Sequence, residues 1–211
     1  MKKMLRAVCG ALVASTAVQA DSIWLGGSDS WGNPAKWSNG VPDKNIKGTF
    51  EAAVFEKTGE QTVTLDGDRA VLTFRVDATA TDGVTLLGGG TDSELHMGDH
   101  ALWSHGIFVD KGAGPVVIGS REPGQAVNVR VFPYKTWENR SEHPVTVYNA
   151  LSGGTDMINY SPWPGIWMMG KYRFSGPNTF VGTIHLGHYL GVPAHVVADH
   201  ADVFTQNKAV Y

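Results

Sequence analysis

Short runs of alternating apolar residues recur between residues 61 and 148, and a new run begins roughly every ten residues. Within each run the apolar residues occupy every second position, and Gly, Asp, Asn or Pro lies at the ends. Because residues two apart on a strand share a face, this pattern predicts short strands that each bury one side. The runs are QTVTL, AVLTFRV, GVTLL, SELHM, GIFV, GPVVI, AVNVRV and HPVTV.

Many short strands at this spacing fit a sandwich, a barrel or a coiled solenoid. Three features favour the solenoid: the strands are very short, the turns are rich in Gly with Asp or Asn, and the apolar residues are mostly Val, Ile and Leu. Such residues can stack from one turn of a solenoid to the next. The sequence therefore predicts an all-β, right-handed parallel β-helix, and an antiparallel β-sandwich remains the alternative.

The segment SIWLGGSDSWGNPAKWSNGVPD places Trp24, Trp31 and Trp37 among Gly, Ser and Asn, with few aliphatic residues. The first turn of a solenoid has no neighbour, so its interior and its strand edge need a cover. Tryptophan buries a large area without a regular backbone. We therefore predict a Trp-rich N-terminal cap over residues 21–55, followed by solenoid turns over 56–211. Exposed tryptophans that stack on sugar rings are the alternative.

Residues 1–20 have the pattern of a secretory signal peptide. Positive charges at positions 2, 3 and 6 precede a small, apolar run that ends at Val18-Gln19-Ala20. That run is too short to span a bilayer. We expect export through this signal to the outside of the cell, its surface or the outer membrane, with Asp21 as the mature N-terminus and no membrane span in the mature chain.

Removal of the signal peptide changes the charge and the cysteine content. Cys9 is the only cysteine, so the mature chain has no disulfide and must be stabilised by its core. The formal charge falls from −3 to −6, because three positive residues leave with residues 1–20. No basic cluster offsets this charge, and we expect no nucleic-acid partner.

Three stretches resemble a known family. They are IWLGGSDSWGNPAKWSNGVPDKNIKGTFEAAVF (23–55), QTVTLDGDRAVLTFRVDATATDGVTLLGGG (61–90) and YRFSGPNTFVGTIHLG (172–187). In this order, they are similar to the N-terminal cap, to the turn that follows it and to the repeat itself in large secreted bacterial proteins with autotransporter-associated β-strand repeats. The repeat is imperfect here, since Val181-Gly182-Thr183 keeps one glycine where the family has two.

The resemblance implies an exported β-helical protein, either the passenger of an autotransporter or a cell-surface protein. It carries over no catalytic residue, because the family is defined by its architecture. The function it implies is a non-catalytic surface scaffold or adhesion module. A carbohydrate-binding or polysaccharide-cleaving β-helix module is the alternative.

The sequence contains no convergent catalytic or metal-binding motif. Eight histidines include those in HMGDHALWSH (96–105) and HLGHYLGVPAHVVADH (185–200). A metal site needs three or four converging ligands, and these side chains would diverge on strands and turns. The carboxylates of Asp66 and Asp68 beside Arg69 are typical of a turn between strands. We predict no cofactor, no metal and no catalytic residue. Whether the protein is an enzyme remains open, with a non-enzymatic role favoured.

An aromatic stretch over about 132–174 departs from the repeating pattern and is predicted to be an insertion. Insertions on a solenoid lie on one flank and often carry recognition. Trp137, Trp163, Trp167 and Tyr172 are therefore the candidate ligand-binding residues, with glycans or host and cell-surface components as partners. Packing of these rings against the solenoid is the alternative.

Overall fold

The computed structural model describes residues 21–42, 52–90, 93–98, 104–132, 135–153, 165–187, 193–204 and 209–210. The predicted signal peptide at 1–20 lies outside these residues. Among the described residues, the 3-10 turn η1 (Pro34–Lys36) is the only helix, and strands make up the other regular elements. No helix in this part of the chain is long or apolar enough to cross a membrane.

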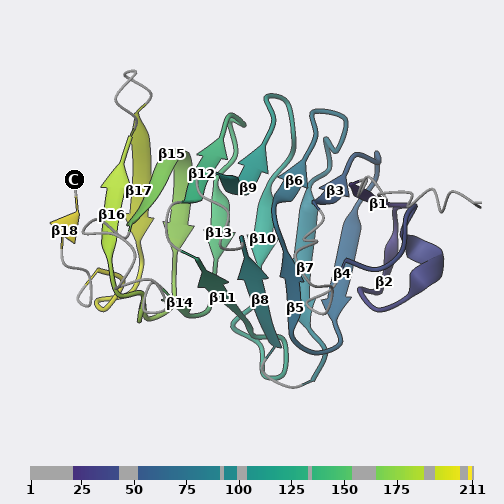
Figure 1. Ribbon diagram of the computed structural model, residues 1–211, viewed down its shortest axis with the longest axis horizontal. Helices are drawn as coiled ribbons and strands as arrows, with labels where there is room; N and C mark the ends of the chain where they lie inside the picture. Colours follow the sequence, from purple (N-terminus) through teal and green to yellow (C-terminus); the bar gives the residue numbers. More distant parts are fainter. Residues whose placement is uncertain are drawn as a thin grey trace, which may run out of the picture.

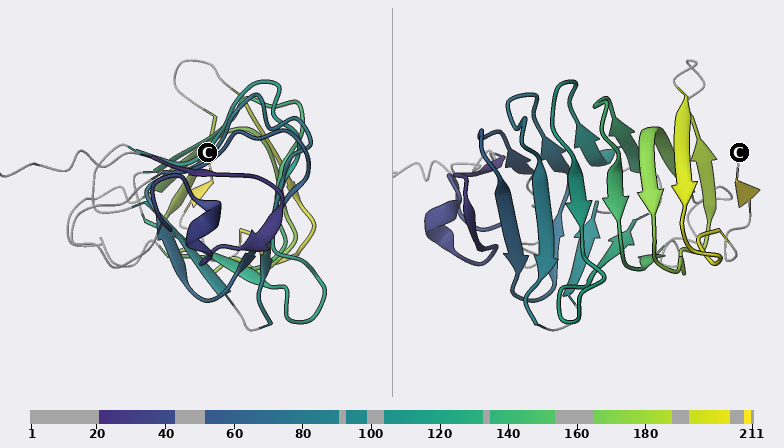
Figure 2. Two further views of the ribbon diagram at one scale, coloured as in Figure 1. Left: turned by 90° about the vertical axis from the view of Figure 1, so that its right-hand side faces the viewer. Right: turned by 180° about the vertical axis from the view of Figure 1, so that it is seen from behind.

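The strands coil around one long axis and form three faces (Figures 1 and 2). Face A contains β1 (Ser22–Trp24), β3 (Ala53–Phe55), β6 (Phe74–Val76), β9 (Ser104–Val109), β12 (Lys135–Asn139), the first part of β15 (Gly165–Phe174), β16 (Thr183–Leu186) and β18 (Ala209–Val210). Face B contains β2 (Ser28–Ser30), β4 (Gln61–Leu65), β7 (Val84–Gly88), β10 (Val116–Ile118), β13 (Val145–Val147), the second part of β15 and β17 (Ala194–Ala198). Face C contains β5 (Arg69–Val71), β8 (Ser93–Met97), β11 (Val127–Val131) and β14 (Leu151–Gly153).

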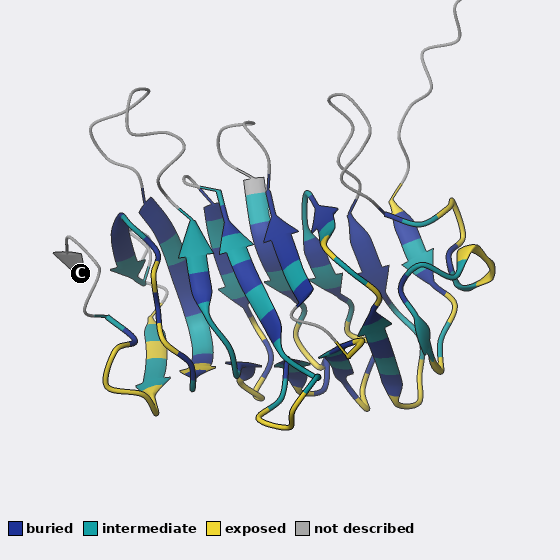
Figure 3. Ribbon diagram, turned by 90° about the horizontal axis from the view of Figure 1, so that it is seen from below, coloured by how far each residue is buried: buried dark blue, intermediate teal, exposed yellow. Residues whose placement is uncertain are grey.

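Every pairing between these strands is parallel, and equivalent residues of successive turns lie side by side. On face B, for example, Val84, Val116 and Val145 share one register position, and all three are buried. Buried and less buried residues alternate along the strands (Figure 3). This arrangement confirms the predicted parallel β-helix and excludes the antiparallel sandwich, because a sandwich would pair neighbouring strands in opposite directions.

The three early tryptophans close the N-terminal end of the coil. Trp24 and Trp31 have no exposed surface and Trp37 has 4%. The ring centroids of Trp24 and Trp37 are 5.1 Å apart, those of Trp31 and Trp37 are 4.9 Å apart, and all three rings lie within 6.4 Å of the Phe55 ring. Phe55 in turn contacts Phe74 of the next turn, at 4.9 Å. The predicted Trp-rich cap is therefore confirmed, and its aromatic contacts continue into the core.

Hydrogen bonds fix the indole groups of the cap. The Trp31 Nε1 donates to the carbonyl of Pro42 at 2.9 Å, and the Trp37 Nε1 donates to the carbonyl of Trp31 at 2.7 Å. The Trp24 Nε1 donates to the carbonyl of Gly27 at 3.3 Å. A buried indole N–H needs a hydrogen-bond acceptor. The irregular backbone of the cap provides carbonyl groups for this purpose, whereas a regular strand uses its carbonyls to pair with neighbouring strands.

Large side chains of β12 fit against glycines of the preceding turn. A Cβ at Gly98 would collide with the side chain of Lys135, and a Cβ at Gly106 would lie 2.6 Å from the Trp137 Nε1. Gly106 is also the extra residue where the pairing of β9 with β12 shifts register. Lys135 and Trp137 are fully buried in consequence.

Strand β15 passes from face A to face B without a loop. Its residues 166–169 pair with β12 on face A, and its residues 172–174 pair with β13 on face B. Gly170 lies between the two parts with φ +93°, a conformation that L side chains rarely adopt. The interval predicted as an aromatic insertion, 132–174, thus contains strands of successive turns over its described parts.

Candidate functional site

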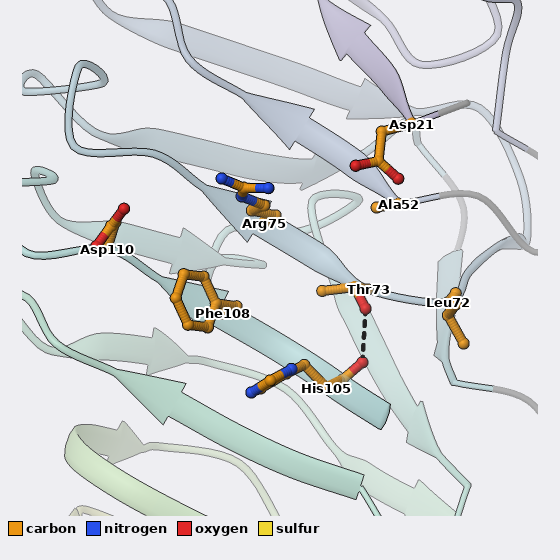
Figure 4. A pocket seen from close by; sticks show the side chains of 8 residues that line it. All are labelled: Asp21, Ala52, Leu72, Thr73, Arg75, His105, Phe108 and Asp110. Atoms are coloured by element: carbon orange, nitrogen blue, oxygen red, sulfur yellow. Dashed lines mark hydrogen bonds between the residues drawn. The ribbon is translucent and has the colours of Figure 1, made fainter. Parts of the chain in front are cut away.

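A groove of about 430 Å³ runs over the outer side of face A (Figure 4). Its lining residues come from β6, β9 and the ends of β1 and β3, and they are Asp21, Ala52, Leu72, Thr73, Arg75, His105, Phe108 and Asp110. Arg75 and Phe108 are direct register partners, so their side chains stand next to each other on the outer side. We refer to this feature as the face A groove.

Two guanidinium groups lie over the Phe108 ring beside the groove. The Cζ of Arg140 is 4.9 Å from the ring centroid and the Cζ of Arg75 is 6.0 Å from it. The imidazole of His105 meets the same ring edge-on, with centroids 5.2 Å apart. Such contacts between a cation and an aromatic ring are attractive, and they hold the flat guanidinium groups in place.

Acidic side chains tie these groups to the surface. The Arg140 Nε donates to Glu138 Oε1 at 2.7 Å, and the His105 Nε2 lies 3.3 Å from Glu138 Oε2. The Arg75 Nε donates to Asp77 Oδ1 at 2.7 Å. Both oxygens of Glu138 are therefore engaged, and the guanidinium groups keep their remaining N–H groups for a ligand.

The groove offers both donors and acceptors of hydrogen bonds. Arg75 supplies donors, Asp21 and Asp110 supply carboxylate acceptors, and Phe108 adds an apolar surface. Hydroxyl groups both donate and accept, so a neutral polyhydroxyl compound suits this lining better than a simple anion or cation. Among the described residues, no group of three or more His, Cys, Asp or Glu side chains could hold a metal ion.

The predicted ligand-binding aromatics do not form one surface. Trp137 on β12 and Tyr172 on β15 are buried, with ring centroids 6.1 Å apart in the core. Burial, and to a smaller extent the charge of Glu138, raise the pKa of Tyr172 well above its ordinary value, so its phenol stays protonated. A fully buried ring offers no face to a sugar, and the packing interpretation describes these two residues. Trp163 lies outside the described residues.

Trp167 is the predicted ligand-binding residue that the structure places on the outer side of the coil. It is partly buried and stacks on His185, with centroids 4.7 Å apart and ring planes 4° from parallel. Thr136 is the register partner of both Trp167 and His105. Trp167 therefore extends, along the same outer row of face A, the surface that begins at the face A groove.

The histidines of the two clusters are divided among different faces. His96 is paired with Glu94 on face C, while His105 and His185 lie on face A. His195 lies on β17 of face B. Partial burial lowers the pKa of His185 below its ordinary value, which keeps the imidazole neutral near pH 7. Positions 99, 100 and 188 lie outside the described residues.

The carboxylates in LDGDR serve different structural partners. Asp66 pairs with Arg69 at 2.6 Å and accepts a hydrogen bond from the Ser30 hydroxyl at 2.8 Å, which joins the cap to the first turn. Asp68 instead accepts from the backbone N–H of Glu94 at 3.1 Å. Partial burial alone would raise the pKa of Asp66, but the hydrogen bonds from Arg69 and Ser30 outweigh it and lower the pKa below its ordinary value of 3.8.

This pKa predicts how the Asp66→Asn variant depends on pH. Because the folded-state pKa is lowered, the ionised carboxylate stabilises the fold above its unfolded pKa, and this contribution is lost as pH falls through the folded pKa. We expect the difference in melting temperature between wild type and Asp66→Asn to be largest above about pH 5 and to shrink below about pH 4. A difference that is unchanged at low pH would contradict the ionic role of Asp66.

Arg75 and Phe108 are not among the residues predicted from the sequence, although a signal for them exists. Arg140 is predicted as a hydrogen-bonding residue of a sugar-binding face, together with Glu138 or Asn139. The stretches FRVD (74–77), IFVD (107–110) and WENR (137–140) occupy the same place in successive turns. Aligning them brings their outward residues Arg75, Phe108 and Glu138 into one row. Each stretch taken alone looks like an ordinary half-buried strand, so the surface becomes visible only when the turns are superposed.

Comparison with known proteins found no match among family models, curated proteins or solved structures. The resemblance to proteins with autotransporter-associated repeats thus stays a prediction that depends on the cap and repeat motifs. The choice of a function depends on the geometry of face A.

Proposed function

We propose that the protein is an exported, non-catalytic β-helical surface scaffold that binds glycans through face A, in the manner of an adhesion module. The observation that carries this proposal is the stack of Arg75, Phe108 and Arg140 beside the face A groove. A passenger-type role at the cell surface agrees with the pattern of residues 1–20 and with the family resemblance.

The direction of the surface favours an extended ligand. The groove is built from neighbouring turns, and Trp167 with His185 continues the same outer row towards the C-terminal end. Parallel stacking thus repeats ring and hydrogen-bonding groups along the axis of the coil. A polysaccharide chain also repeats a ring and its hydroxyl groups along its length, so it can present matching groups to this surface.

Cleavage of a glycan is the second candidate, because two carboxylates line the same groove. Asp21 and Asp110 lie at its opposite ends, with Arg75 between them (Figure 4). Glycoside hydrolysis uses two carboxyl groups about 5–9.5 Å apart that flank the bond to be broken. Asp21 and Asp110 are separated by three strand spacings, which makes cleavage less favoured than binding. Glu138 is less suited to this role, because Arg140 and His105 already engage its oxygens.

A glycan array combined with a reducing-sugar assay tests the proposal with wild type and Phe108→Ala. We expect wild type to bind at least one glycan without releasing reducing ends. The Phe108→Ala variant should bind at least about tenfold more weakly, because the ring supports both guanidinium groups. Leu87→Ala, an outward apolar residue of face B, is the matched control and should bind like wild type.

Three results would contradict the proposal. They are the absence of binding to any glycan, equal binding by wild type and Phe108→Ala when both have the same melting temperature, and equal weakening by the Leu87→Ala control. Release of reducing ends that is abolished by Asp110→Asn would replace binding with cleavage.

A further inference from the structure

A second groove, of about 410 Å³, lies on the outer side of face B near the C-terminal end of the coil. We call it the face B groove. It lies between β13, β15 and β17, and its lining residues are Pro144, Thr146, Tyr148, Lys171, Tyr172, Arg173, His195 and Val197. The face A groove carries two carboxylates, whereas the described lining of the face B groove has none.

The strand register gathers basic side chains in this groove. Lys171 and His195 are direct register partners on adjacent strands, and Arg173 follows Lys171 on the same side of β15. Adjacent strands lie about 4.8 Å apart, so these groups face the same small volume. Lys171 and Arg173 are two cationic groups on one side of β15, and a bound anion would offset their mutual repulsion.

The acidic partners of these groups lie outside the groove. Lys171 Nζ is 2.9 Å from Glu142 Oε2, but the Glu142 side chain is 85% exposed. Arg173 Nε is 3.5 Å from Asp199 Oδ2, and the same oxygen accepts the hydroxyl hydrogen of Ser175 at 3.1 Å. Exposed ion pairs of this kind contribute little to stability, so a ligand can displace the carboxylates of Glu142 and Asp199 at a small cost in free energy. The Lys171 Nζ also donates to the backbone carbonyl of Glu142 at 3.0 Å, a bond that such a ligand leaves in place.

We propose that the face B groove binds an oxyanion, namely a sulfate or carboxylate group of an acidic polysaccharide. Arg173 offers a planar fork of N–H donors, Lys171 offers a compact charge, and the Thr146 hydroxyl offers a further hydrogen bond. Thr146 is the register partner of Arg173, so the two side chains leave adjacent positions on the same side of the sheet. This site is independent of the face A groove, because it uses other strands and another ligand chemistry.

Calorimetric titration at low ionic strength tests the proposal with three probes. These are inorganic sulfate, a sulfated dextran oligosaccharide and its unsulfated counterpart. We expect saturable binding of a sulfated probe and none of the unsulfated one, with affinity falling as salt is added. The sulfated oligosaccharide should bind at least about tenfold more tightly than sulfate if the ligand is a polymer. Equal affinity of the two would instead assign the site to a free anion and overturn the polysaccharide part of the proposal.

Variants separate this site from general surface charge. Lys171→Gln and Arg173→Gln should each weaken binding at least about tenfold. The affinity of Arg173→Lys should lie between that of these two variants and that of wild type, since lysine keeps the charge but lacks the planar set of N–H donors. Lys57→Gln removes another partly exposed lysine, which pairs with Glu56, and should bind like wild type. Absence of saturable binding, or equal weakening by Lys57→Gln, would overturn the oxyanion site.

Discussion

Replacing Trp31 by alanine is expected to lower the free energy of unfolding by about 3–5 kcal/mol, the usual cost of truncating a fully buried large aromatic side chain. Trp31 has no exposed surface, and its ring lies 4.9 Å from the Trp37 ring and 6.4 Å from the Phe55 ring. Truncation would also leave the carbonyl of Pro42 without the hydrogen bond that it now accepts from the indole. The loss should be large, because the first turn of the coil has no other described element over its end.

Urea unfolding followed by far-ultraviolet circular dichroism measures this effect. Leu25→Ala is the matched control within the cap, because Leu25 is 49% exposed. This substitution should change the free energy of unfolding by less than about 1 kcal/mol. Trp31→Phe should lower the free energy of unfolding less than Trp31→Ala, since phenylalanine keeps much of the buried aromatic area. A Trp31→Ala variant as stable as the Leu25→Ala variant would show that the cap does not stabilise the coil.

Replacing Gly170 by alanine is expected to destabilise the protein by at least about 2 kcal/mol. Gly170 has φ +93°, and a Cβ there would collide with the backbone carbonyl of Asn139 in the preceding turn. Its N–H also donates to the carbonyl of Pro193 at 2.9 Å in the following turn. A shift of the backbone to relieve the collision would therefore disturb the pairing of β15 on both sides.

Gly59→Ala distinguishes the collision from backbone strain alone. Gly59 has a similar φ of +88°, but an added Cβ would have no atom within 4 Å. We expect Gly59→Ala to cost about 1–2 kcal/mol from the left-handed conformation and Gly170→Ala to cost clearly more. Melting temperatures of the two variants provide the comparison, and equal losses would contradict a close approach of the turns at Gly170.

The cap and the coil could be predicted from the sequence because both have strong local signals. Three tryptophans within a short Gly-rich segment have few other uses than to cover a surface, and the alternation of Val, Ile and Leu marks the inner side of most strands. Strand β12 lacks that signal, since its inner residues are Lys135, Trp137 and Asn139. The sequence therefore did not distinguish a buried Trp137 from a ligand-binding one.

Tertiary contacts explain why polar residues face inward on β12. The Asn139 amide donates to the carbonyls of His143 and Lys171, both at 2.8 Å, so the buried group satisfies backbone acceptors of two turns. The side chain of Lys135 packs where Gly98 leaves room. The contacts of Asn139 with Lys171 and of Lys135 with Gly98 join residues far apart in the sequence, and no local pattern reports them. The same holds for the face A groove, whose residues come together only through the register of successive turns.

The glycines that face Lys135 and Trp137 have a consequence for how this chain could change during evolution. Coiled β proteins can in principle lengthen by copying a turn, because each turn contacts only its neighbours. A second copy of the turn that carries β12 would set its Lys135 against the first copy, in which Phe132 takes the register position that Gly98 holds in the preceding turn. The large side chains of β12 therefore fit only beside a turn that has small residues at the facing positions. Simple duplication of this turn would thus not reproduce the packing that the present order of turns allows.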